Sequence, residues 1–101
     1  MEKVIKDGKV GVLISPGFGA GFYSWGYPTE AIFDPTLIGL VENEKWQEAI
    51  DYCESTWEDS YSGGVHDLRV AWIDEGTRFI IEEYDGAESF RFEEDIDWIT
   101  A

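Results

Sequence analysis

Apolar residues open the chain in two short runs, within residues 2–6 and 9–14, with Asp7-Gly8 between them. An Asp-Gly pair between apolar runs favours a two-residue hairpin turn, because both turn positions require a positive φ. The second run is almost wholly apolar, which is typical of a strand covered on both faces. The pattern therefore predicts an N-terminal β-hairpin whose second strand is central.

Helical spacing replaces the strand pattern in the middle of the chain. Residues 29–33 fit one helical turn. Asp34-Pro35 is a strong helix start, because an aspartate caps the first N–H groups and a proline at that position needs none. A short helix is predicted from there to Glu42, and a second one over 45–56. The apolar stripe of the second helix comprises Trp46, Ala49, Ile50, Cys53 and Trp57, which makes the cysteine a packed thiol.

The C-terminal half returns to strand patterns. It predicts a meander of three strands, at residues 68–73, 77–84 and 88–92. With the N-terminal hairpin, these strands predict a single α+β domain over 1–101, in which an antiparallel sheet of about five strands has two helices packed on one face. The apolar spacing of the tail 95–99 predicts that it docks on this domain.

Composition agrees with a folded domain and argues against several classes of protein, among them membrane-spanning and secreted proteins. The 101 residues are 44% hydrophobic and 16% aromatic, which is enough for one modest core. No stretch has the length of a membrane span and the first residues are no signal peptide, so a cytoplasmic protein without membrane contacts is expected. The lone cysteine and the lone histidine do not form a triad or a zinc site. No enzymatic activity, cofactor or metal is expected.

Negative charge is the strongest global feature. Seven Lys and Arg face 22 Asp and Glu, for a net charge of −15, and residues 51–101 contribute −12 of it. Such a surface repels nucleic acid and anionic membranes and attracts basic partners. Solubility alone is the alternative explanation of the charge.

An uncharged segment rich in glycine and aromatic residues, 15–28, follows the central strand. Its spaced glycines let backbone N–H groups converge on an anion, and its rings suit a planar ligand. The dinucleotide fingerprint and the lysine-bearing phosphate loop are absent. A structural crossover packed on the core is the alternative. An arginine of the meander would pair a phosphate of the ligand. The predicted ligand site therefore combines loop residues with two arginines: Gly17, Phe18, Gly19, Gly21, Phe22, Tyr23, Trp25, Arg69 and Arg78.

Acidic residues crowd the last predicted hairpin and the segment after it. Carboxylates spaced over a surface imitate nucleic-acid phosphates and can occupy a basic cleft of another protein. Ordinary solvated turn residues are the alternative. The residues of this second predicted site are Glu82, Glu83, Asp85, Glu88, Glu93, Glu94 and Asp95.

Five short segments carry a resemblance that covers most of the chain. They are Gly8-Lys9-Val10, Ser15-Pro16-Gly17-Phe18-Gly19-Ala20-Gly21, Ile32-Phe33-Asp34-Pro35, Glu83-Tyr84-Asp85-Gly86-Ala87-Glu88-Ser89 and Asp97-Trp98-Ile99-Thr100-Ala101. In these segments the chain resembles a family of small acidic proteins, of uncharacterised activity, from tailed bacteriophages and prophages. The resemblance implies an accessory protein in the bacterial cytoplasm, where small phage proteins often antagonise host defence. It assigns no binding residues.

Two functions are therefore predicted at different places. The leading one is a non-catalytic, phage-type protein that counters host defence by binding a small nucleotide-like signal at 15–28. The alternative is an acidic decoy that imitates nucleic acid and blocks a basic site on a host protein through residues 82–97. Neither function involves direct binding of nucleic acid. The aromatic loop and the last edge strand are also compatible with a homo-oligomer.

Overall fold

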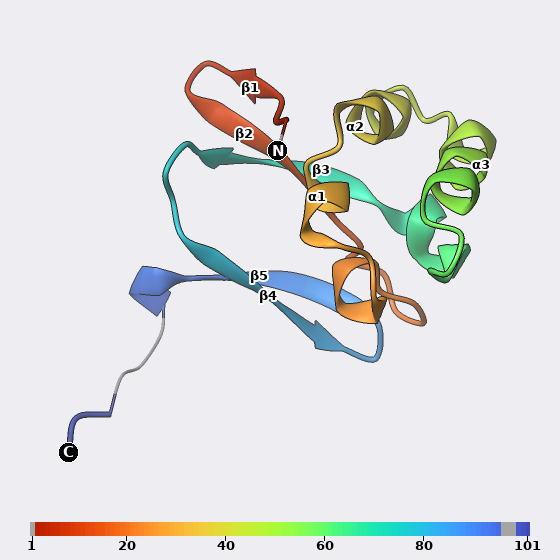
Figure 1. Ribbon diagram of the computed structural model, residues 1–101. Helices are drawn as coiled ribbons and strands as arrows, with labels where there is room; N and C mark the ends of the chain where they lie inside the picture. Colours follow the sequence, from red (N-terminus) through yellow and green to blue (C-terminus); the bar gives the residue numbers. More distant parts are fainter. Residues whose placement is uncertain (1, 96–98) are drawn as a thin grey trace.

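A computed structural model describes residues 2–95 and 99–101. The chain begins with a hairpin of β1 (Ile5–Lys6) and β2 (Lys9–Ile14), drawn in red and orange in Figure 1. Asp7 and Gly8 join the two strands with φ angles of 53° and 74°, which confirms the predicted two-residue turn. Only Lys9 of β2 is exposed, as expected for a central strand.

β2 is the middle strand of a three-stranded antiparallel sheet. Its second neighbour is β3 (Arg69–Asp74), and the register places Val12 opposite Ala71. This pairing joins the beginning of the chain to its second half and encloses the loop and the helices between the two strands. The sheet therefore depends on contacts between residues that are distant in the sequence.

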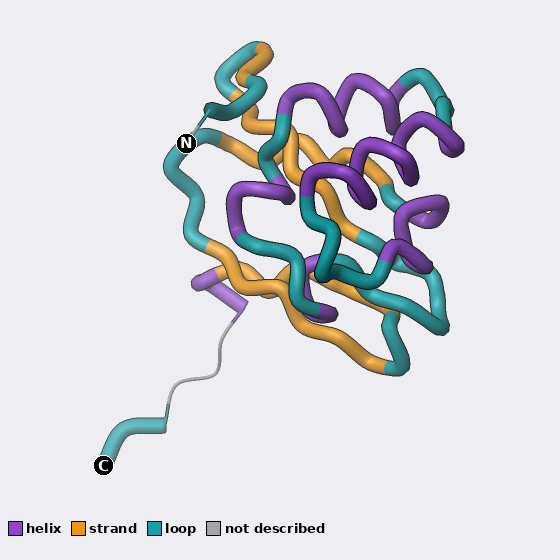
Figure 2. The backbone as a smooth tube through the Cα atoms, turned by 45° about the vertical axis from the view of Figure 1, so that its right-hand side comes forward, coloured by secondary structure: helices purple, strands orange, loops and turns teal. Residues whose placement is uncertain are grey.

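Three helices follow the loop. They are α1 (Thr29–Ile32), α2 (Pro35–Glu42) and α3 (Trp46–Thr56). The Asp34 carboxylate accepts a hydrogen bond from Leu37 N at 2.9 Å, which confirms the predicted start of α2. Figure 2 shows the helices gathered on one side of the strands. This arrangement follows from the apolar stripe that each of the two longer helices turns toward the core.

β4 (Phe79–Tyr84) and β5 (Ala87–Phe92) form a separate two-stranded sheet. The prediction of an α+β fold with five antiparallel strands is confirmed, but the strands are divided between two sheets. β3 pairs with β2, and residues 75–78 then carry the chain away from it. The second sheet is positioned by the packing of one mostly apolar face and by hydrogen bonds to the loop that follows β2. The residues that contact the core from this face are Phe79, Ile81, Phe90 and Phe92.

One apolar core joins these elements. Its largest fully buried apolar side chains come from β2, the loop, α2 and the end of the segment before β3; they include Phe22, Leu13, Leu37, Ile38 and Leu68. Short 3₁₀ turns complete the chain at η1 (Tyr23–Trp25), η2 (Ser62–Asp67) and η3 (Glu93–Asp95). Among the described residues, no helix combines the length and the apolar character needed to cross a membrane.

The predicted docking of the tail falls mostly outside the described residues. Residues 96–98 belong to that undescribed part. Ile99, which follows them, is 98% exposed and so does not contribute to the core.

Candidate functional site

The carboxylate of Glu88 organises the loop over residues 15–28. Its Oε1 accepts a hydrogen bond from Ser15 N at 2.9 Å. Its Oε2 accepts three, from Phe22 N at 2.8 Å, Ser24 N at 2.9 Å and Ser24 Oγ at 2.7 Å. Glu88 is only 3% exposed. The loop does form an anion-binding arrangement of N–H groups, but the anion that fills it is a side chain of the same protein.

Strand register explains how Glu88 reaches the loop. In the β4–β5 hairpin it lies opposite Glu83, in line with the apolar pairs of the inner face. Because side chains alternate along a strand, Glu88 is on the face that packs against the core. The pairing register of the predicted hairpin would have placed Glu88 on its inner face. The sequence prediction missed this because it treated Glu88 as a surface acid.

Glu83 holds a second part of the loop. Its Oε2 accepts a hydrogen bond from Trp25 Nε1 at 2.7 Å. Like charges directly opposite each other on a hairpin repel. The repulsion between Glu83 and Glu88 is offset by the hydrogen bonds that each carboxylate accepts from the loop. The pair therefore acts as two anchors, one for the backbone of the loop and one for an aromatic side chain.

Backbone contacts fasten the same two segments. Gly19 N donates to Asp85 O at 2.7 Å, and Glu88 N donates to Ser15 O at 2.8 Å. Gly86 has φ of 84°, and a Cβ atom at this position would lie 2.5 Å from Ala20 N, so only glycine permits this approach. The two sites predicted at different places in the sequence are therefore adjacent in the structure.

The loop residues of the predicted ligand site have different surroundings. Phe18 is 75% exposed, and Tyr23 and Trp25 are exposed to a lesser extent. Phe22 is fully buried and stacks on Tyr27 with ring centroids 4.0 Å apart. The prediction that Phe22 stacks on a ligand is therefore wrong, because both faces of its ring lie within the core.

The glycines of the loop also differ from the prediction. Of Gly17, Gly19 and Gly21, only Gly19 donates a backbone hydrogen bond in the described part of the chain, and its acceptor is a carbonyl oxygen. Gly21 is buried, whereas Gly17 is half-buried next to Asp67. The N–H groups that converge on an anion belong to the neighbouring non-glycine residues. Gly17 and Gly21 instead allow close packing, because a Cβ atom at either position would lie against a neighbouring side chain, and Gly19 allows a positive φ of 107°.

The arginines do not join the loop. Arg69 Nη1 donates to Leu68 O at 2.7 Å, and its guanidinium lies 5.6 Å from the centroid of the Trp46 ring. Arg78 forms an ion pair with Glu93 at 3.5 Å. Arg69 faces the helical side, and Arg78 lies just before β4, at the end of the hairpin away from its tip. The structure therefore does not bring together the predicted combination of glycine loop and arginine.

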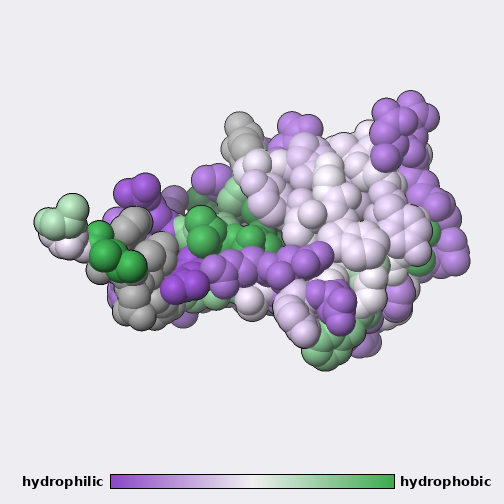
Figure 3. Space-filling model, turned by 90° about the horizontal axis from the view of Figure 1, so that it is seen from below, coloured by the Kyte–Doolittle hydropathy of each residue, from purple (hydrophilic) through white to green (hydrophobic). Residues whose placement is uncertain are grey.

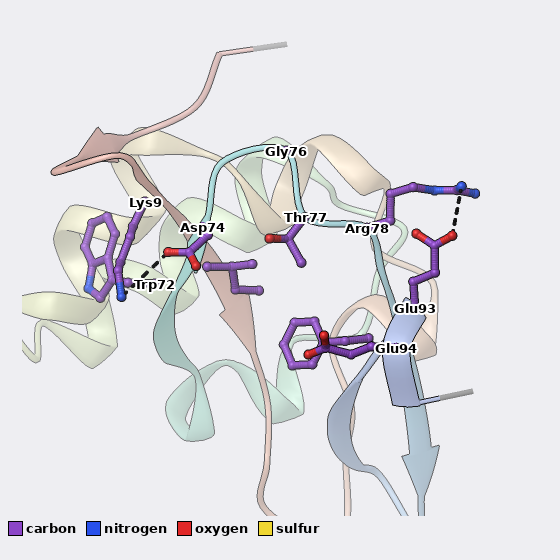
Figure 4. Close-up of a pocket in the computed structure, with 10 residues that line it drawn as sticks. Lys9, Trp72, Asp74, Gly76, Thr77, Arg78, Glu93 and Glu94 are labelled. Atoms are coloured by element: carbon purple, nitrogen blue, oxygen red, sulfur yellow. Dashed lines mark ion pairs between the residues drawn. The ribbon is translucent and has the colours of Figure 1, made fainter. Parts of the chain in front are cut away.

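Arg78 lines the larger of two notable cavities, shown in Figure 4. This cavity, about 700 Å³ in volume, lies between the turn after β3 and the start of η3. Its two cations are already paired, Lys9 with Asp74 at 3.8 Å and Arg78 with Glu93 at 3.5 Å. These exposed pairs stabilise the protein little. They nevertheless leave the cavity without a net excess of positive charge for an anionic ligand.

The second cavity lies where the loop meets the hairpin tip. It is about 590 Å³ in volume and is lined by Phe18, Gly19, Trp25, Glu83, Asp85 and Gly86. In the described residues, neither carboxylate of this cavity forms an ion pair. Trp25 also stacks on Tyr61, which is 61% exposed, with ring centroids 5.9 Å apart. We call the surface formed by Phe18, Trp25, Tyr61, Glu83 and Asp85 the aromatic–acidic face.

The remaining acids of the second predicted site are spread along the hairpin and beyond it. Glu82 pairs with Arg91 at 3.1 Å on the outer face of the hairpin. Seen from below in Figure 3, hydrophobic groups lie among strongly hydrophilic ones on this side of the molecule. Glu94 lines the larger cavity, and Asp95 is the last residue of η3. The prediction that Glu88 contacts a partner is wrong, because its carboxylate is buried under the loop.

The lone cysteine has no reactive setting. Cys53 is fully buried on α3. Burial, and secondarily the charge of Asp34, raise the pKa of its thiol to about 12. The thiol is therefore protonated at neutral pH, and this confirms the prediction of a packed side chain.

No protein-family model matches this chain, and searches of the curated proteins and of the solved structures found no similar protein.

Proposed function

We propose that this is a non-catalytic binding protein whose partner is a protein with a basic surface of the kind that binds nucleic-acid phosphates. One observation carries the proposal: the cavity at the aromatic–acidic face holds two carboxylates, Glu83 and Asp85, that form no ion pair with the described residues. Carboxylates of this kind are available to lysine and arginine side chains of another protein.

The overall charge supports the same partner. A net charge of −15 accelerates encounter with a basic protein and suppresses association with acidic ones. Exposed aromatic rings next to the acids add contact area that nucleic-acid phosphates lack. A protein of this type competes with nucleic acid for the same lysines and arginines.

The nucleotide-like ligand stays a prediction that the geometry favours less. The backbone donors of the loop are engaged by Glu88, the adjacent cavity carries acids, and Arg69 and Arg78 lie elsewhere. An anionic ligand would meet a negative field without a compensating cation. The decoy function is therefore the better supported of the two.

The resemblance to phage proteins suggests where such a protein acts. We place the proposed activity in the bacterial cytoplasm during infection, with a basic host protein as the partner. Blocking the nucleic-acid site of a defence protein would counter host defence without catalysis.

A displacement experiment tests the proposed function. A fluorescently labelled DNA duplex is bound to a ten-residue arginine peptide, and the protein is then added. We expect the protein to release the duplex at about 50 mM NaCl. Direct binding of a fluorescently labelled copy of the arginine peptide to the protein should weaken roughly tenfold or more between about 50 and about 300 mM NaCl, because salt screens exposed charges. Failure to bind the labelled peptide at the lower salt concentration would overturn the proposal.

A charge-matched pair of variants locates the binding surface. Glu83→Gln with Asp85→Asn removes two charges from the aromatic–acidic face. Glu48→Gln with Glu58→Gln removes two exposed charges on and just after α3. We expect the first variant to weaken peptide binding much more than the second. Equal weakening by both would show that net charge alone attracts the peptide, which contradicts the proposed site.

A panel of mononucleotides and cyclic dinucleotides tests the other function. We expect no ligand-induced shift of the melting temperature with any of them. A shift that Trp25→Ala removes, and that the variant lacking the charges of Glu83 and Asp85 keeps, would favour the nucleotide-like ligand instead.

A further inference from the structure

We infer that the cavity at the aromatic–acidic face takes the guanidinium group of one arginine side chain of the partner. This inference rests on the proposed function, which it makes specific. It starts from the two kinds of group that share the cavity wall: exposed aromatic rings and carboxylates without ion pairs. Together they suit a flat cation better than an apolar group or an anion.

The aromatic wall is accessible and partly fixed. Phe18 is 75% exposed, so one side chain of this wall is open to a partner. Trp25 is held from two sides, because its Nε1 donates to Glu83 Oε2 at 2.7 Å and its ring stacks on Tyr61. A guanidinium plane stacks on such rings through cation–π attraction, and arginine does so more often than lysine.

The acidic wall supplies acceptors for the N–H groups of the same cation. Glu83 uses Oε2 for Trp25, which leaves Oε1 to accept a further bond. Asp85 uses its backbone oxygen for Gly19 and has no ion pair in the described part of the chain. The five donors of a guanidinium group lie in one plane, so it can stack and bond to carboxylates at the same time. A lysine ammonium lacks this geometry.

The cavity is formed before any partner arrives. Its loop side is held by the four hydrogen bonds to Glu88, and its hairpin side by the contact of Gly86 with the loop backbone. A side chain that enters it therefore orders few groups of this protein. A preformed site binds more tightly for the same contacts, because less conformational entropy is lost.

Two labelled peptides test the inference. One is a ten-residue lysine peptide, and the other is the same peptide with a single central arginine. We expect the arginine peptide to bind the wild-type protein about fivefold more tightly by fluorescence anisotropy, the effect of about 1 kcal/mol of stacking and hydrogen bonding. Phe18→Ala should remove most of that difference while the lysine peptide still binds.

Ile80→Ala is the matched control, since Ile80 is a 51% exposed apolar residue on the outer face of β4. This variant should preserve the difference between the peptides. The melting temperature of both variants should stay close to that of the wild type, because both side chains are exposed. Equal binding of the two peptides, or a difference that survives Phe18→Ala, would overturn the arginine site. Salt-sensitive binding of both peptides would still support the proposed function, whereas no binding of either would overturn that function itself.

Discussion

The helical side of the molecule and the junction of loop and hairpin are stabilised in opposite ways. On the helical side, α2 buries Leu37, Ile38 and Val41 against the first sheet, and apolar burial supplies the stability. At the junction, one buried carboxylate collects three backbone N–H groups and a hydroxyl. The first kind of contact has no preferred direction, whereas the second needs each donor in place.

The difference shows why the candidate site lies at the junction. A surface built on apolar burial hides its side chains, while a junction held by hydrogen bonds keeps Phe18 and Trp25 exposed. The loop can then present aromatic rings to solvent and still hold one conformation. Four of the hydrogen bonds at the junction also end on a single carboxylate, that of Glu88, and this makes the comparison open to experiment.

The largest effect is expected from removing the Glu88 carboxylate. Glu88→Ala leaves the N–H groups of Ser15, Phe22 and Ser24 buried or half-buried without their acceptor. Buried donors without partners each cost about 1–3 kcal/mol, so we expect the free energy of unfolding to fall by roughly 4 kcal/mol. Urea denaturation measures the loss.

Two controls sharpen this prediction. Glu83→Ala removes a carboxylate that accepts one exposed hydrogen bond, so it should cost no more than about 1 kcal/mol. Acetate should raise the melting temperature of Glu88→Ala, compared with chloride at the same ionic strength, because it can occupy the vacated anion site. Acetate should not raise that of Leu37→Ala, a variant of the helical side. Equal losses in Glu88→Ala and Glu83→Ala would contradict the role of Glu88.

A pH dependence is expected from the helical side. Burial raises the pKa of Cys53 to about 12 and raises that of Tyr27 as well. Below about pH 9 the thiol is protonated in both the folded and the unfolded protein. Above that pH the thiol ionises in the unfolded chain first, so the free energy of unfolding should fall as the pH rises toward 12. Urea midpoints from pH 8 to pH 11 measure this, and Cys53→Ala should have the shallower slope. Parallel slopes would contradict the assignment to Cys53.

A smaller effect is expected at the start of α2. The Asp34 carboxylate caps the helix through Leu37 N and accepts a hydrogen bond from Tyr52 Oη at 2.9 Å. Asp34→Ala should lower the free energy of unfolding by about 1–2 kcal/mol. The helical side should tolerate this change without rearranging the loop, so peptide binding at the aromatic–acidic face should stay at the wild-type level. Loss of binding would mean that the two regions are coupled.

The smallest change in stability is expected from Trp25→Phe. This variant keeps an aromatic ring but removes the Nε1 donor to Glu83. Because the bond is exposed, the free energy of unfolding should fall by only about 0.5 kcal/mol. Binding of the arginine peptide should nevertheless weaken, since the ring is less firmly held. An unchanged affinity would show that the tether between Trp25 and Glu83 is not part of the site.

Much of the fold was predictable because its signals are local. The Asp7-Gly8 turn, the Asp34 cap and the helix over 46–56 depend on residues within a few positions of each other. The division of the strands into two sheets was not predictable in this way. It depends on whether β4 pairs with the second edge of β3 or packs apart from it, and the apolar pattern of β4 suits either arrangement.

The candidate site was predictable in its parts but not in its assembly. Segment 15–28 and the acids of the last hairpin stand out from composition alone, because one lacks charge and the other concentrates it. Their adjacency arises from hydrogen bonds that span more than half of the chain, such as that from Ser15 N to Glu88. The same tertiary contacts bury Phe22 and keep Arg69 and Arg78 away from the loop.

The sequence by itself determined the turns, the helix starts, the acidic character and the neutrality of the loop, since each follows from neighbouring residues or from a sum over the chain. Only the tertiary structure decided that the anion for the loop is Glu88. An inward-facing glutamate on a short hairpin has no local partner, so its role depends on which segment the fold brings over it. The physical reason is that burying a charge costs free energy. Here that cost is offset only when the loop donates its hydrogen bonds to the carboxylate of Glu88.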